Sequence, residues 1–254
     1  MPITKILLSL SIFASALMQG EVASAEVFEL RTYTTNEGKL DDLNARFRDH
    51  TVKLFEKHGI RSLGYWVPTD EKKSRNTLIY IIAHKDRAAA KASWKAFLSD
   101  PDWKAAHEAS EANGPILAKA PESVYMNATD YSKGVSKGES DDDAVYELRI
   151  YKTAEGKLVP LDARFRDHTI KLFDQHGIQS VGYWHPADQP AASSTLIYLV
   201  RHKTRDGAKV AWQSFSKDPN WQNVAKESQK NHGRLLSERP TSIYMVPTNY
   251  SAMQ

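Results

Sequence analysis

Short stretches rich in β-branched and aromatic residues punctuate the first half of the chain, and polar or glycine-containing segments separate them. In the first stretch apolar and polar residues alternate, which is typical of a strand that buries one face. The pattern therefore predicts four strands, at residues 27–34, 61–67, 77–84 and 123–127.

Two segments between these strands have helical spacing instead. Residues 38–58 carry an apolar stripe, and His58-Gly59 supplies the glycine that commonly ends a helix. Residues 86–99 form a second helix, which breaks at Asp100-Pro101 because Asp can cap a new helix and Pro fits its first position. The stripe of the first helix consists of Leu40, Leu43, Phe47 and Leu54.

The same series of elements occurs twice. Residues 28–66 align with residues 146–184 at an offset of 118, with 27 identities in 39 pairs. The offset is still 118 at Trp103 and becomes 119 by Glu108 and Glu227, which places one inserted residue between these positions. A unit of about half the chain indicates a duplicated domain, because solenoid repeats are only about 20–50 residues long.

The N-terminus has the features of a secretory signal peptide. Lys5 precedes an apolar run of thirteen residues, 6–18, which is shorter than the ~20 residues that a membrane-spanning helix needs. Ala23-Ser24-Ala25 offers small residues for cleavage before Glu26, and an uncleaved membrane anchor is the alternative. We expect a mature chain of 254 − 25 = 229 residues that is periplasmic or secreted and has no membrane contact after cleavage.

Each repeat has the order β-α-β-β-α-β, which is that of a ferredoxin-like unit with both helices on one face of an antiparallel sheet. The other sheet face must also be buried. Two repeats in one chain can do this by packing sheet against sheet, so we expect an α+β fold that closes as an intrachain α/β barrel with the helices outside. The expected parts are a signal peptide (1–25), a first repeat (26–131), a polar linker (132–143) and a second repeat (144–254).

Four motifs give the chain its resemblance to the NIPSNAP family of the dimeric α/β-barrel superfamily. They are the ELRxYxxxxGKL entry, the helix ending in HG, the GYW strand and the DPxW break, and they occur in both halves. The resemblance implies the barrel fold. Because the fused halves can close the barrel internally, we expect a monomer with an internal pseudo-dimer, or a homodimer if an exposed strand edge or helix face pairs two chains. It implies no single chemistry, because members of the family have no common reaction.

Composition excludes several classes of site. The chain has no cysteine, which excludes disulfides, thiolate zinc sites, iron–sulfur clusters and cysteine nucleophiles. Basic and acidic residues number 34 and 31 and are interleaved, so no basic block predicts nucleic-acid binding. No metal-ligand motif or phosphate-binding loop is present either, and we expect neither a metal site nor a cofactor.

The first strand of each repeat separates two sets of side chains. Phe28 and Leu30 point to one face, and Glu29, Arg31 and Tyr33 point to the other. We expect the apolar set to meet the helices and the Glu-Arg-Tyr set to face the barrel interior, where it could bind a small anionic or aromatic molecule. The predicted ligand-binding residues are Glu29, Arg31, Tyr33, Tyr80, Glu147, Arg149, Tyr151 and Tyr198.

The same residues also allow a structural interpretation, because Glu and Arg two positions apart can form a buried ion pair that binds nothing. An enzyme is a third alternative: the superfamily resemblance implies cofactor-independent oxygenases and isomerases, for which Tyr33, Glu29 and His50 would transfer protons. The candidate catalytic residues are His50 and His168. Haem binding is the weakest alternative, and its candidate ligands are His50, His84, His168 and His202.

Overall fold

A computed structural model describes residues 25–134 and 143–253. Residues 1–24 of the predicted signal peptide and residues 135–142 of the predicted linker lie outside these residues. The first repeat consists of β1 (Val27–Thr34), α1 (Leu40–Arg46), η1 (Phe47–Thr51), α2 (Val52–Lys57), β2 (Arg61–Pro68), β3 (Thr77–His84), α3 (Arg87–Ser99), α4 (Pro101–Ser110) and β4 (Glu122–Ala128). The second consists of β5 (Val145–Lys152), α5 (Leu158–Arg164), η2 (Phe165–Thr169), α6 (Ile170–Gln175), β6 (Gln179–Pro186), η3 (Ala191–Ser193), β7 (Thr195–His202), α7 (Arg205–Lys217), α8 (Pro219–His232) and β8 (Thr241–Pro247).

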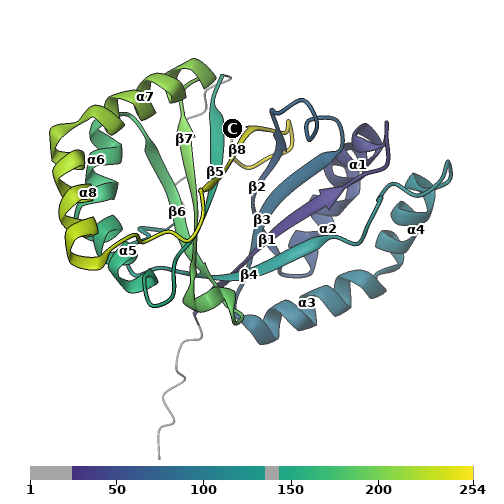
Figure 1. Cartoon of the computed structure of the whole chain (residues 1–254). Coiled ribbons are helices and arrows are strands. Elements are labelled where there is room, and N and C mark those ends of the chain that lie inside the picture. The colour runs from purple at the N-terminus through teal and green to yellow at the C-terminus, as the bar shows by residue number, and fades with distance from the viewer. Residues whose placement is uncertain (1–24, 135–142, 254) are drawn as a thin grey trace, which may run out of the picture.

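The eight strands form one closed antiparallel barrel in the order β1-β3-β2-β8-β5-β7-β6-β4. The two repeats join at β2–β8 and β4–β6, where each pair of strands shares three residue pairs. Figure 1 shows the helices of the first repeat on one side of the barrel and those of the second repeat on the other. The expected α/β barrel with external helices is therefore confirmed.

The long helix of each repeat differs from the prediction in its middle. Five residues of π-helix, η1 and η2, interrupt it at the sequence FRDHT. Thr51 donates a hydrogen bond from its hydroxyl to the carbonyl of Arg46, 3.1 Å away, which attaches its side chain to the preceding turn. The predicted break after Ser99 is confirmed, because Asp100 accepts a hydrogen bond from the Asp102 amide and Pro101 begins α4.

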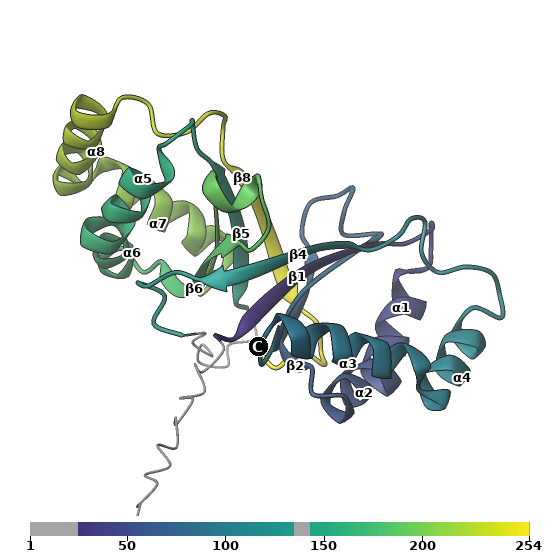
Figure 2. The same ribbon diagram turned by 90° about the horizontal axis from the view of Figure 1, so that it is seen from below.

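The barrel interior is apolar, and side chains of both repeats fill it. The sheet of each repeat buries its inner face against that of the other. Figure 2 shows from below that the strands lie between the helices of the first repeat and those of the second. The buried members of this core are Phe28, Leu30, Leu63, Trp66, Ile79, Ile81, Ala83, Met126, Tyr146, Leu148, Val181, Trp184, Ile197, Leu199, Met245 and Met253. The expectation that Phe28 and Leu30 meet the helices is therefore wrong, and so is the expectation of a polar interior.

The reason lies in which neighbours each face of the sheet can reach. β3 and β7 are buried along their whole length, so both sheet faces carry apolar residues and alternation alone cannot distinguish inside from outside. Inside the barrel only other strands can supply partners, so a charge is accommodated there only where a strand does so, as Gln179 of β6 does for the buried Arg201 of β7, 2.9 Å away. The outer face lies against helices that supply polar donors such as the indole of Trp94, and the charged residues take that face.

The end of each repeat packs against the other repeat. After β4, Tyr131 joins the helix-side core of the second repeat and donates a hydrogen bond to Asp162, at 2.7 Å. After β8, Tyr250 does the same in the first repeat and donates to Asn44, also at 2.7 Å. This reciprocal exchange joins the halves along segments that lie beyond the strands.

Among the described residues, no helix has the length and apolar character that a membrane-spanning segment requires.

Gly64 of the GYW motif is required by the close packing of Trp66. A Cβ atom at Gly64 would collide with the indole of Trp66, which is fully buried in the barrel core. We expect Gly64→Ala to lower the free energy of unfolding by about 1–3 kcal/mol through overpacking, as measured by urea denaturation. In a Trp66→Leu background the same change should cost almost nothing, because the ring is gone. An equal cost in both backgrounds would contradict this account.

Candidate functional site

The predicted ligand-binding residues gather in two equivalent clusters, one in each repeat, between the sheet and the helices. Glu29, Arg31 and Tyr33 project from the outer face of β1, and Tyr80 lies beside them on β3, where it pairs with Arg31. Trp94 of α3 covers the group. The structure thus brings together the four side chains expected in each repeat, but outside the barrel.

The Glu29 carboxylate is fully buried and accepts four hydrogen bonds. Oε1 receives one from Arg31 and one from Ser123, both at 2.6 Å, and Oε2 receives one from the indole of Trp94 at 2.8 Å. The Nε2 of His84 lies 3.2 Å from Oε2 and donates the fourth, because a carboxylate only accepts. The donors come from β1, β3, β4 and α3.

The second repeat reproduces this arrangement around Glu147. Arg149 and Ser242 contact Oε1 at 2.6 Å each, and Trp212 and His202 contact Oε2 at 2.6 and 3.1 Å. Each arginine also lies over a tryptophan ring, with 4.5 Å between the guanidinium carbon and the ring centroid in both repeats. The two clusters therefore have the same geometry to within a few tenths of an ångström.

These contacts determine what the clusters can do chemically. Burial alone would raise the pKa of Glu29, but the hydrogen bond from His84, the charge of Arg31 and the bonds from Ser123 and Trp94 lower it to about 2. The pKa of Glu147 is lowered to about 2 in the same way. Both groups are anions at neutral pH and their lone pairs are occupied, so neither can act as a base or receive a ligand.

The tyrosines of the clusters are equally unsuited to proton transfer. Burial raises the pKa of Tyr80 and of Tyr198 well above that of an ordinary phenol, so both keep their protons. In the second repeat Tyr198 donates a hydrogen bond to Tyr151 at 2.9 Å. The contacts favour the structural interpretation, in which each cluster ties three strands to a helix.

The candidate catalytic histidines lie elsewhere. His50 and His168 sit in η1 and η2 and are exposed, and each lines a groove between its π-helix and the last helix of its repeat. Glu29 is buried beneath the helices, so His50 and Glu29 do not converge on one site. For haem ligation, His84 and His202 offer only Nδ1, since their Nε2 atoms bond the glutamates.

The groove of the first repeat is the larger one. Between η1–α2 and α4 it encloses about 880 Å³, and α4 contributes Ala105, Ala106 and Ala109 to its wall. A further space of about 320 Å³ adjoins it and shares His50 and Ala109 with it. The remaining lining residues of the larger space are Asp49, His50, Lys53, Leu54, Glu56, Lys57 and Asp102.

The second repeat has two smaller spaces in the same place, of about 360 and 320 Å³. Asn223, Val224 and Glu227 stand where the first repeat has Ala105, Ala106 and Ala109. Every residue that α4 contributes to the smaller space of the first repeat has a counterpart 118 positions later in α8. The predicted insertion between Trp103 and Glu108 is thus wrong, and the extra residue enters at the helix end, where α8 reaches His232.

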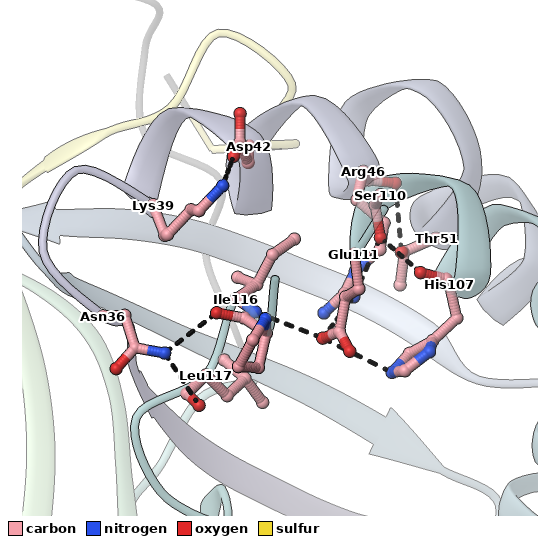
Figure 3. Close-up of polar contacts among 11 residues, drawn as sticks. Asn36, Lys39, Asp42, Arg46, Thr51, His107, Ser110, Glu111, Ile116 and Leu117 are labelled. Atoms are coloured by element: carbon pink, nitrogen blue, oxygen red, sulfur yellow. Dashed lines mark hydrogen bonds and ion pairs between the residues drawn. The ribbon is translucent and has the colours of Figure 1, made fainter. Parts of the chain in front are cut away.

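Arg46 lines the smaller of the two spaces in the first repeat and is buried; Figure 3 shows its polar contacts. Its Nη1 donates to Ser110 at 3.1 Å and forms an ion pair with Glu111 at 3.5 Å. The Glu111 carboxylate also accepts a hydrogen bond from the Ile116 amide at 3.3 Å and lies 3.7 Å from His107. In residues 25–134 and 143–253, no three His, Cys, Asp or Glu side chains come together as a group that could hold a metal ion.

Sequence reasoning missed these grooves, although two signals were present. The small residues Ala105, Ala106 and Ala109 mark a helix face with little to fill a groove. The loss of Glu111 in the second repeat, where Gln229 stands at the offset of 118, is the other signal. The π-helical turns had no sequence signal of their own.

Comparison with known proteins assigns the architecture to a family. The sequence profile of the NIPSNAP family matches residues 28–133 and again residues 146–252. The chain belongs to the NIPSNAP family. No curated protein matches this NIPSNAP chain in sequence.

Solved structures resemble it at low identity. A candidate monooxygenase from Fusobacterium nucleatum is 10% identical over 88% of this chain and 93% of that chain, with a TM-score of 0.60. One from Lactobacillus acidophilus is 11% identical over 91% and 100%, with a TM-score of 0.53. A NIPSNAP family protein from Agrobacterium tumefaciens is 18% identical over 44% and 99%, with a TM-score of 0.38. At these identities the likeness of the NIPSNAP chain to the first two is one of fold.

The Glu29 cluster should make the stability of this NIPSNAP protein depend on acid pH. Because folding lowers the pKa of Glu29 from 4.5 to about 2, the stabilisation is complete above pH 4.5 and is lost as the pH falls toward 2. That window corresponds to about 3 kcal/mol of unfolding free energy for each glutamate.

Glu29→Gln should remove the contribution of Glu29 in that window and lower the unfolding free energy at pH 7 by about 3–5 kcal/mol, because Arg31 stays buried without its counterion. Urea unfolding at pH 7, 4.5 and 2.5 measures both effects. Glu147→Gln is the matched variant and should behave alike. An unchanged pH slope in both variants would refute the assignment.

Proposed function

We propose that this protein binds a small anionic or aromatic molecule in the groove between η1–α2 and α4 of the first repeat. The observation that carries the proposal is the volume of about 880 Å³ behind the alanines of α4, which falls within the range of small-molecule sites. This groove replaces the barrel interior as the proposed binding site, because side chains fill the interior.

The groove combines an apolar wall with a few charged groups, as ligand pockets commonly do. Leu54 and Ala106 provide apolar surface, while Lys53 and His50 provide groups that can meet an anion. Neither the Lys53 side chain nor the His50 side chain donates a hydrogen bond to any other residue that the structure describes. Lys57, by contrast, forms ion pairs with Asp100 and Asp102 at 2.8 and 3.4 Å, so its charge is already compensated.

The π-helical turn supports a functional role for the groove. Such turns are rare and occur frequently at functional sites, and η1 carries both Asp49 and His50 into the lining. The enzyme alternative has less support. Tyr33 and Glu29 lie between the sheet and the helices, whereas His50 lies on the exposed side of η1. The monooxygenase descriptions belong to the fold neighbours, and binding is the function that the geometry of this chain supports best.

Exchanging the groove walls between the repeats tests this proposal. The triple variant Ala105→Asn, Ala106→Val and Ala109→Glu gives the first groove the wall of the second, which folds with those residues. Titration with anilinonaphthalene sulfonate, an aromatic anion, should show one saturable fluorescent site in the native protein and at least about tenfold weaker binding in the variant.

Lys104→Asn is the matched control, since Lys104 lies on α4 outside the groove lining, and it should leave the binding constant unchanged. Native affinity in the triple variant, or the absence of saturable binding in the native protein, would be incompatible with a ligand site in this groove.

We also propose that the protein is exported and cleaved before Glu26, on the strength of Lys5, the apolar run 6–18 and the small residues at 23–25. The intact mass of protein recovered from the periplasm or medium of an expressing cell should correspond to residues 26–254. Ala23→Leu with Ala25→Leu should block cleavage and leave the longer chain. Full-length protein confined to the cytoplasm would contradict export.

A further inference from the structure

Arg164 of α5 is the counterpart of Arg46 at the offset of 118, yet its surroundings differ. Arg46 has Ser110 and Glu111 as partners. The guanidinium of Arg164 forms no hydrogen bond or ion pair with any residue in the described part of the chain, and its Nε is buried without a partner, as is the Nε of Arg46. Its guanidinium carbon lies 5.3 Å from the ring centroid of Trp221, and it lines the groove of about 320 Å³ between α5–η2 and α8.

The residues opposite explain the difference. At the offset of 118, Ser228 and Gln229 replace Ser110 and Glu111, so an amide stands where the first repeat has a carboxylate. The Ser228 hydroxyl is also buried without a hydrogen-bond partner. The arginine and serine side chains that bond each other in the first repeat therefore have no such bond in the second, and a buried hydroxyl without a partner is uncommon in folded proteins.

We propose that the groove between α5–η2 and α8 binds a small carboxylate, whose carboxyl group pairs with Arg164 in the place that Glu111 occupies beside Arg46 in the first repeat. The guanidinium fork is suited to two parallel hydrogen bonds with such a group. This site is independent of the aromatic-anion groove of the first repeat.

The groove also limits the rest of the ligand. Pro160, Ala163 and Val224 give it an apolar wall, and its volume admits only a small body. Glu227 and Asp167 at its rim disfavour a second negative charge. A monocarboxylate with a compact apolar body, such as an aryl or short alkyl acid, satisfies both conditions.

Burial lowers the pKa of Arg164, and the only groups that raise it are Tyr151 and Tyr198. Glu111 has that compensating effect on Arg46, and Arg164 has no carboxylate in its place. A bound carboxylate would restore the compensation that the first repeat builds into its own chain. The second repeat therefore has an arginine without a carboxylate partner where the first repeat has an ion pair.

Benzoate is a suitable probe, followed by calorimetry and ligand-observed NMR on the purified protein. The native protein should bind one benzoate per chain at this site, and Arg164→Ala should weaken binding at least about tenfold, as expected for a lost charge-assisted pair. Arg166→Ala is the matched control: it removes the same charge two positions further along the chain, where the guanidinium pairs with Asp130, and should bind as the native protein does.

Gln229→Glu provides a second test that does not depend on removing the arginine. It replaces the amide by a carboxylate of the same shape, which should form an ion pair with Arg164 as Glu111 does with Arg46. The protein should stay folded and bind benzoate several-fold more weakly. The triple variant of the first-repeat groove should keep its benzoate affinity, which separates this site from that of the proposed function.

Three results would overturn the inference: no saturable benzoate binding by the native protein, native affinity in Arg164→Ala, or native affinity in Gln229→Glu. Phenyl phosphate serves as a comparison of ligand chemistry. Binding of phenyl phosphate in preference to benzoate would show an oxyanion site of a different class and would likewise refute the carboxylate assignment.

Discussion

The fold depends on one constraint, which is that the inner face of each four-stranded sheet has no cover within its own repeat. The helices protect only the outer face, so each repeat uses the sheet of the other to bury residues such as Trp66 and Trp184. The short β2–β8 and β4–β6 pairings and the exchanged segments around Tyr131 and Tyr250 follow from this arrangement. Fusion of the two repeats makes the association intramolecular, so closing the barrel does not depend on protein concentration.

The location of polar groups follows from the same constraint. Because the interior is filled by apolar side chains from strands of both repeats, charged residues on β1 and β5 must point outward, where helices and the last strands can supply donors. Glu29 and Glu147 each collect four such donors, which converts a costly buried charge into a connection between strands and a helix. Their pKa values near 2 show the result of that connection and also explain why these carboxylates are poor candidates for catalysis.

Periodicity and the internal repeat were sufficient to predict the strands, the ferredoxin-like order and the closed barrel. They could not predict which face of β1 is internal. β3 is apolar on both faces, and the sequence does not say on which side of the sheet hydrogen-bond donors lie. They brought Glu29, Arg31, Tyr33 and Tyr80 together correctly but on the wrong side of the sheet. The grooves were beyond them, because a groove depends on how far apart two helices pack and on the volume of facing side chains.

The two repeats share what builds the barrel and differ in what lines the grooves. The hydrogen-bond distances in their glutamate clusters agree to within a few tenths of an ångström, whereas α4 carries alanines where α8 carries Asn223, Val224 and Glu227. A difference confined to the outer helices does not affect the inner sheet contacts on which closure depends. Each groove can therefore acquire its own lining, a wide one beside His50 and a narrow one beside Arg164, without loss of the common fold. In such a protein the positions where the repeats disagree identify chemistry better than the positions where they agree, because agreement is already required by the barrel.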